Sequence, residues 1–183
     1  TTAAVTAQYN STGFGSCDVS RVYLPFDTSS LGTGATISDA TLSVYVTAKT
    51  NQVNDGSDTI RVTQGSSTFG SFGFTSGATS IDIGSITTSA YNTFTLDSTG
   101  RGWINKSGTT ELGLRELHEI SGSMSSSVAG NSITISTSEQ TGTSQDPYLT
   151  ITYSPASPPS RVMRISEGFV VKIIQGTVRV YEQ

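Results

Sequence analysis

The segment Thr41–Ala48, TLSVYVTA, decides the fold class of this chain. Its apolar residues Leu42, Val44 and Val46 alternate with Ser, Tyr and Thr, so they lie on one face of an extended strand. The same period of two recurs at short intervals, with Gly, Asn, Asp and Ser between the segments. Many short strands with turn residues between them predict an all-β, antiparallel, jelly-roll-like sandwich.

We predict nine strands before the C-terminal region, each bounded by turn-forming residues. They cover Val5–Tyr9, Arg21–Phe26, Thr41–Ala48, Thr59–Thr63, Ser80–Ile83, Asn92–Leu96, Glu111–Arg115, Ser132–Thr137 and Tyr148–Tyr153.

One segment favours a short helix of about two turns. In LDSTGRGWINKSG, Asp97 or Ser98 can cap the helix, and Gly108 can end it. Trp103 is the only tryptophan of the chain. We expect its ring to close the end of the sandwich, and an exposed platform for sugars is the alternative.

The composition excludes some classes of protein. Only 13% of the residues are charged and 34% are hydrophobic, while Ser and Thr together make roughly a third. The net charge of −4 argues against wholesale nucleic-acid binding. No run of 18 apolar residues exists, so we expect no membrane span. Strands with hydroxyl-rich outer faces are typical of extracellular and virion surface proteins.

The C-terminal region differs from the rest. We divide the chain into a sandwich over residues 1–154, a Pro-rich linker over 155–160 and an anchoring segment of three strands over 161–183. These strands are predicted at Arg161–Ile165, Phe169–Ile174 and Thr177–Tyr181, and the middle one is apolar on nearly both faces. Twenty-three residues cannot form a stable core alone, so we expect an assembly interface. Its predicted residues are Val162, Ile165, Phe169, Val171, Ile173, Val178 and Val180.

Charge separates the same two regions. Residues 1–160 contain 6 Lys/Arg and 12 Asp/Glu, a net charge of −6, and residues 161–183 contain 4 and 2, a net charge of +2. A basic strand module and an acidic body suit head-to-tail docking, which physiological salt screens, and a charged outer face explains the pattern equally well. The partners we expect are copies of this chain or a neighbouring structural subunit, and a polysaccharide.

The candidate ligand-binding residues are aromatic. The loop STFGSFGFTSG places Phe69, Phe72 and Phe74 among glycines and serines, where the rings can stack on sugars or pack under the loop as a small second core. Trp103 completes this set. Tyr23, Tyr45 and Tyr91 are candidates for an aromatic platform on a sheet face.

We predict neither an enzyme nor a cofactor. His118 is the only histidine and is expected in a surface loop, and no Gly-x-Ser-x-Gly elbow accompanies it. Glu116 and Glu119 flank it, but glycosidase carboxylates need a defined separation in a cleft. Asp55 and Asp58 lie in NQVNDGSDTI, which is a weak calcium candidate and more simply an ordinary turn.

Three ordered segments give the chain a resemblance to a known family. SRVYLPFDTSSLGTGATISDATLSVYV (Ser20–Val46) is similar to the opening of DNRLRE-type domains. FTLDSTGRGWINKSGTTELGLRE (Phe94–Glu116) resembles their Trp-bearing helix and the strand that ends in Leu-Arg, and SQDPYLTITY (Ser144–Tyr153) resembles their closing strand. The eponymous motif is only partly present, at Leu112–Glu116. The resemblance covers residues 1 to about 154.

The resemblance implies a secreted jelly-roll sandwich related to carbohydrate-binding modules, and says little about function. From the whole sequence we expect a non-catalytic structural protein, such as a fibre, filament or decoration subunit, on an extracellular, cell or virion surface. Its C-terminal strands would anchor it, and its sandwich would be displayed for adhesion to glycans. The alternative is a carbohydrate-binding module of a larger secreted enzyme or adhesin.

Overall fold

The structure is a computed structural model, and it describes most of the chain. For residues 2–10, 16–17 and everything from 163 onward, only the backbone is described. The described residues are 2–10, 16–53, 56, 58–122, 130–137, 144–156, 163–165, 169–174 and 177–179.

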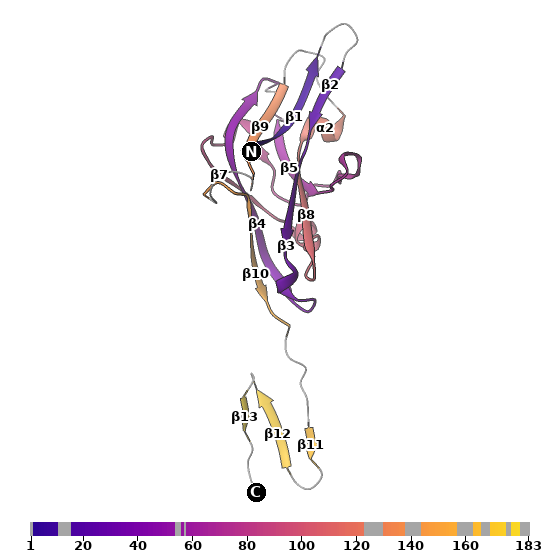
Figure 1. The fold of residues 1–183 in the computed structure, drawn as a ribbon, viewed down its shortest axis with the longest axis vertical. Helices are drawn as coiled ribbons and strands as arrows, with labels where there is room; N and C mark the ends of the chain where they lie inside the picture. Colours follow the sequence, from indigo (N-terminus) through magenta and orange to yellow (C-terminus); the bar gives the residue numbers. More distant parts are fainter. Residues whose placement is uncertain are drawn as a thin grey trace.

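Two antiparallel sheets form a sandwich, as the sequence predicts (Figure 1). The six-stranded sheet has the order β10-β4-β9-β1-β2, with β7 also paired to β4. Its strands are β1 (Thr2–Asn10), β2 (Ser16–Ser20), β4 (Thr36–Asn51), β7 (Ala90–Thr95), β9 (Gly130–Ser136) and β10 (Tyr148–Ser154). The four-stranded sheet has the order β3-β8-β5-β6. Its strands are β3 (Val22–Asp27), β5 (Thr59–Gln64), β6 (Ile81–Asp82) and β8 (Thr109–Glu116).

All nine strands predicted for this part of the chain are present. The sequence analysis missed β2, and it missed the helix α2 (Leu117–Ser121) that follows β8. The jelly-roll winding stays a prediction. Three short 3-10 turns complete the described elements of the sandwich: η1 (Ser29–Leu31), η2 (Phe69–Ser71) and η3 (Ile83–Ser85).

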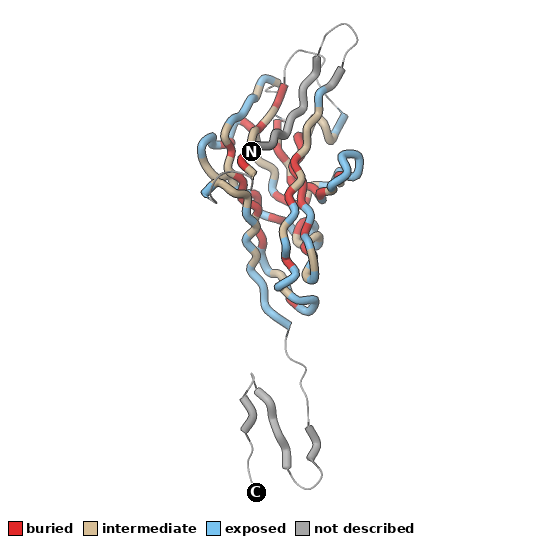
Figure 2. The backbone as a smooth tube through the Cα atoms, in the orientation of Figure 1, coloured by how far each residue is buried: buried red, intermediate tan, exposed pale blue. Residues whose placement is uncertain are grey.

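The hydrophobic core lies between the two sheets, where Figure 2 shows the buried residues gathered. Leu42, Val44 and Val46 of β4 are completely buried, which confirms the face predicted from their spacing. Leu112 and Leu114 of β8 meet them from the four-stranded sheet in one continuous cluster. In β4 and β8, alternation turns these apolar residues toward the core.

The predicted helix forms as α1 (Ser98–Gly102), with Asp97 as its N-cap. The Asp97 carboxylate accepts hydrogen bonds from the backbone N–H groups of Thr99 and Gly100, at 2.7 and 3.0 Å. The helix ends at Gly102 and not near Gly108, because two glycines within five residues give it little intrinsic stability.

Trp103 follows α1 and packs against the core, partly buried. Its closure of the end of the sandwich stays a prediction. The approach is close: a Cβ atom at Gly77 would lie within 3.0 Å of the Trp103 ring, and one at Gly100 would lie within 3.0 Å of the Gly77 carbonyl. Glycine at both positions therefore lets the helix and the Gly77 loop touch backbone to backbone.

We expect Gly100→Ala to destabilise the protein by about 1–3 kcal/mol, because the added methyl group overpacks this contact. Gly102→Ala is the matched control in the same helix, since a Cβ atom there meets nothing within 4 Å. Urea denaturation of both variants measures the difference. Equal stability of the two variants would contradict the close packing of α1 on the Gly77 loop.

The C-terminal segment forms a third, separate sheet with the order β11-β12-β13 (Figure 1). The strands are β11 (Met163–Ile165), β12 (Phe169–Ile174) and β13 (Thr177–Arg179), each within the range predicted for it. Among the described residues, no strand pairing joins this sheet to the sandwich. No described helix has the length and apolar character needed to cross a membrane.

Candidate functional site

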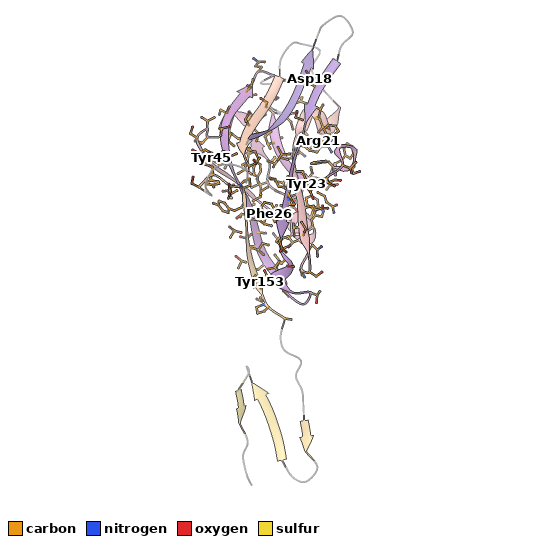
Figure 3. All side chains as sticks on the ribbon, in the orientation of Figure 1. Asp18, Arg21, Tyr23, Phe26, Tyr45 and Tyr153 are labelled. Carbon is orange, nitrogen blue, oxygen red and sulfur yellow. The ribbon has the colours of Figure 1, made fainter. Side chains whose placement is uncertain are left out.

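The outer face of the four-stranded sheet carries most of the unusual side chains. Residues that point away from the core on β3, β8 and β5 alternate with the buried Leu and Val positions. Figure 3 shows Arg21 and Tyr23 on this side of the sandwich and Tyr45 across it. The loop that contains Phe69, Phe72 and η2 covers part of this outer face.

An ion-pair network lies under this loop. Glu119 of α2 accepts hydrogen bonds from Arg115, at 2.5 and 2.7 Å, and from Arg21, at 2.6 Å. Arg115 is fully buried, although it lies on the outer face, and its guanidinium also donates to the Gly73 carbonyl. Arg21 donates to the Phe69 carbonyl. One carboxylate thus holds two arginines and ties the loop to the sheet.

The three phenylalanine rings of this loop differ in their exposure to solvent. Phe72 is only 6% exposed and sits on Gly113, where a Cβ atom would collide with its ring. Phe69 and Phe74 are 53% and 66% exposed. The Arg21 guanidinium carbon lies 4.1 Å from the centre of the Phe69 ring, and that of Arg115 lies 4.4 Å from the centre of Phe74. Phe72 alone therefore packs under the loop, while the other two rings stay accessible.

Trp103 does not join these rings. Its neighbours are Gly77 and Gly100, and no ring contact links it to a phenylalanine within the described chain. The three candidate tyrosines also lie on two different sheets. Tyr45 and Tyr91 pair across β4 and β7, while Tyr23 lies on the other sheet and donates to Glu111.

Tyr148, which the sequence analysis did not select, extends the tyrosine pair. Its ring centre lies 5.1 Å from that of Tyr91, and that of Tyr45 lies 5.4 Å from Tyr91 on the other side. The planes meet at 63° and 85°, so the rings interlock edge to face and form no flat platform. Burial, followed by the charges of Tyr148 and Asp146, raises the pKa of Tyr91, whose hydroxyl donates to backbone carbonyls.

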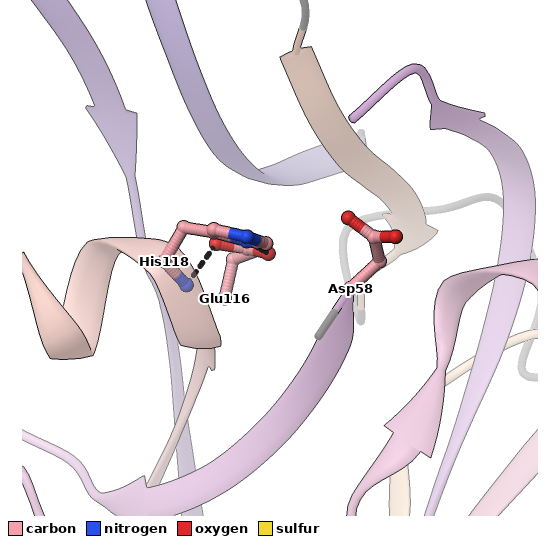
Figure 4. A group of neighbouring side chains, drawn as sticks. All are labelled: Asp58, Glu116 and His118. Atoms are coloured by element: carbon pink, nitrogen blue, oxygen red, sulfur yellow. Dashed lines mark hydrogen bonds and ion pairs between the residues drawn. The ribbon is translucent and has the colours of Figure 1, made fainter. Parts of the chain in front are cut away.

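A buried polar cluster lies on the opposite, inner side of the end of β8 (Figure 4). Asp58 and Glu116 are 1% exposed and His118 is 4% exposed. The expectation that His118 lies in a surface loop is therefore wrong. Alternation explains the burial: Glu116 continues the inward series of Leu112 and Leu114, and α2 then turns His118 back over it.

Hydrogen bonds join the cluster tightly. One Glu116 oxygen is 2.7 Å from His118 Nδ1 and accepts from Asn131 at 3.2 Å, and the other caps α2 through the backbone N–H groups of His118 and Glu119. Asn131 also donates to Asp58, at 2.5 Å. Sequence reasoning overlooked Asn131 because nothing in its local pattern marks it.

This cluster offers one imidazole and two carboxylates whose ligand atoms lie within 4.8 Å of one another. That donor set suits Zn²⁺ in principle. Both Glu116 oxygens already make hydrogen bonds, however, so the arrangement fits a buried polar network. Asp55 lies outside the described residues. Asp58 is buried and accepts a hydrogen bond from Asn131.

The two glutamates that flank His118 are separated by the structure. Glu116 points into the core, and Glu119 points outward to the two arginines. Burial by itself raises the pKa of Glu119, but the hydrogen bonds and charges of Arg115 and Arg21 outweigh it and leave that pKa below its ordinary value of 4.5. The pair therefore does not face a common cleft, as a glycosidase would require.

Comparisons of the chain with protein-family models, with curated proteins and with solved structures found no match. The resemblance to DNRLRE-type domains stays a prediction.

We expect Glu119→Gln to lower the free energy of unfolding at pH 7 by about 2 kcal/mol, because Gln lacks the negative charge and one of the two acceptor oxygens that hold Arg21 and Arg115. A lowered pKa stabilises the fold above the unfolded-state value and loses that effect as pH falls through the folded-state value. The difference between the two proteins should therefore shrink below about pH 4.5. Urea denaturation at pH 7 and at acidic pH checks this, and a pH-independent difference would contradict it.

Asn131→Asp tests the buried cluster by placing a third carboxylate beside Asp58 and Glu116. We expect a loss of about 3 kcal/mol, because an uncompensated buried charge is added. Asn105→Asp is the control, since Asn105 is exposed and uses its side-chain oxygen as the acceptor. Thermal unfolding with and without added Zn²⁺ measures both. Rescue of Asn131→Asp by Zn²⁺ would show that the cluster with a third carboxylate can bind a metal.

Proposed function

We propose that this chain is a non-catalytic structural subunit that assembles through its C-terminal sheet and displays its sandwich on an extracellular or virion surface. The observation that carries the proposal is the way strand register sorts the residues of that sheet between its two faces. Glycan contact through the exposed rings of the sandwich belongs to the same proposal, since Phe69 and Phe74 are largely exposed.

Residues directly opposite each other in antiparallel strands share a face. Met163 pairs with Val171, Ile165 with Phe169, and Ile173 with Val178. One face of the sheet therefore consists wholly of apolar residues, and the other carries three basic residues. The apolar face is Met163, Ile165, Phe169, Val171, Ile173 and Val178. The basic face is Arg164, Val170, Lys172, Ile174, Thr177 and Arg179.

Such a sheet needs a second layer. Its strands have three, six and three residues, and a single layer of this size cannot bury the apolar face by itself. The sheet pairs only within itself in the part of the chain that the structure describes.

The occupant that fits best is the same face of a second copy. Every copy carries an identical apolar face, so two of them can meet about a two-fold axis with the sheets about 10 Å apart. Arg164, Lys172 and Arg179 lie on the other face, so contact between apolar faces buries none of these charges. This refines the predicted interface. Met163 joins it, and Val162 and Val180 lie outside the described residues.

Val171→Lys and Val170→Lys test the assembly, because neighbouring valines of one strand lie on opposite faces. We expect Val171→Lys to give a monomer and Val170→Lys to keep the wild-type oligomer. Light scattering after size-exclusion chromatography measures the mass of each full-length protein and of a chain ending at Ala156. An oligomeric Val171→Lys protein, or a wild-type monomer, would refute assembly through this face.

The alternative, a carbohydrate-binding module of a larger secreted protein, is supported by the exposed rings alone. It predicts a monomer that a polysaccharide column retains, with retention lost on removal of Phe69 or Phe74. The mass measurement therefore separates the two functions.

A further inference from the structure

Two acidic side chains are buried together on the inner side of the four-stranded sheet, where β8 meets α2 (Figure 4). Asp58, directly before β5, and Glu116, the last residue of β8, are each 1% exposed. A single amide, that of Asn131, donates to both carboxylates, at 2.5 and 3.2 Å. Two negative charges held beside one neutral donor are costly away from water, and buried charges in proteins are paired or bind metals.

Pairing is incomplete in this cluster. On the outer side of the same segment, Glu119 is paired with two arginines. Among the described residues, no Lys or Arg forms an ion pair with Asp58 or Glu116, and the one basic partner is the His118 imidazole, 2.7 Å from Glu116. Even a protonated imidazole offsets only one of the two charges. The cluster can therefore take up a further positive charge, either a proton or a metal cation.

The positions of the donor atoms favour a metal cation. One ligand atom each from Asp58, Glu116 and His118 lies within 4.8 Å of the other two. A tetrahedral Zn²⁺ ion with bonds of about 2.0–2.2 Å needs ligand atoms about 3.4 Å apart. Side-chain movements of about 1 Å therefore bring these three atoms into the range of one ion.

The hydrogen bonds of the cluster are compatible with a bound ion. The contact between Glu116 and His118 Nδ1 shares one proton, and an ion bound to both atoms takes its place. The second Glu116 oxygen stays on the backbone N–H groups that it caps. Asn131 stays as the outer donor to both carboxylates, and donors of this kind hold metal-bound carboxylates in position. Only one bond of the network is therefore exchanged for the metal.

The types of ligand indicate which metal fits. Imidazole together with carboxylates suits Zn²⁺. Ca²⁺ takes about six to eight oxygen ligands, and Mg²⁺ keeps several waters in an octahedral shell. The cluster offers three side chains, one of which is the His118 imidazole, so water is left as the fourth ligand. This donor set therefore favours Zn²⁺ over the Ca²⁺ that the sequence weakly indicated for Asp58.

We propose that Asp58, Glu116 and His118 form a structural site for one Zn²⁺ ion. The ion ties the start of β5 to the end of β8 and to α2, and α2 carries Glu119, which holds the two arginines under the phenylalanine loop. The site uses no residue of the C-terminal sheet. It goes beyond the proposed assembly function and does not depend on it.

Thermal unfolding of the full-length protein tests the site, after dialysis against a chelator and addition of Zn²⁺, Ca²⁺ or Mg²⁺. We expect Zn²⁺ at about 100 times its dissociation constant to raise the melting temperature by about 5 °C or more, because only the folded chain brings the ligands together. Ca²⁺ and Mg²⁺ should give a much smaller rise. His118 is the only histidine, so the one set of imidazole resonances in the NMR spectrum should shift when Zn²⁺ is added.

Four variants locate the site, with calorimetry as the measure of Zn²⁺ affinity. Asp58→Asn and His118→Gln each remove one ligand, and each should weaken binding by about 100-fold or more, because loss of even an outer partner of a ligand costs about 10- to 100-fold. Glu119→Gln is the matched control, since this carboxylate lies one residue from His118 but points outward to the arginines. Cys17→Ser removes the only thiol of the chain, which is another zinc ligand. Both controls should bind Zn²⁺ as the wild type does.

Four results would overturn the proposal: a melting temperature that excess Zn²⁺ leaves unchanged, imidazole resonances that do not respond to Zn²⁺, an equal rise with Ca²⁺, or an affinity that survives Asp58→Asn and His118→Gln. The first would show that protons alone neutralise the cluster. The imidazole resonances are measured on the wild type, so they decide the question even where a substitution prevents folding.

Discussion

The structure depends on β8, which is buried on both faces. Leu112 and Leu114 fill the core on one side, and Gly113 and Arg115 are covered on the other by Phe72 and Glu119. A strand buried on two sides must satisfy both an apolar and a polar environment at alternate positions. The polar side is satisfied here by a single glutamate that holds two arginines.

The last residue of β8, Glu116, connects this strand to α2 and to the other sheet. Glu116 is the last inward residue of the strand, and its two oxygens connect α2, His118 and Asn131 of β9. Because α2 is capped by Glu116, the next glutamate along the helix, Glu119, emerges on the outer face to meet Arg115. One short segment, Glu116–Glu119, therefore serves the inner cluster and the outer network together.

The two outer surfaces of the molecule contrast in chemistry. The six-stranded sheet carries interlocked tyrosines, whereas the four-stranded sheet concentrates arginines in a chain that is acidic overall. Glu119 lies on the same face and offsets part of the positive charge of Arg21 and Arg115. The C-terminal sheet is two-sided in another way: one face is apolar, and the other carries the basic residues.

The sequence by itself determined the strands other than β2, because the period of two and the turn residues are local properties. It also determined the inward face of β4, the Asp97 cap of α1 and the three C-terminal strands. It did not indicate α2, whose N-cap is the uncommon Glu116, or the burial of His118.

Only the tertiary structure decided which side chains meet. Arg21, Arg61 and Arg115 are far apart along the chain, and strand order and register alone bring them into one row. The Asn131 bridge and the grouping of Phe69 and Phe72 on Arg21 likewise depend on long-range pairing. Periodicity assigns a residue to a face, but the neighbours on that face are set by the fold.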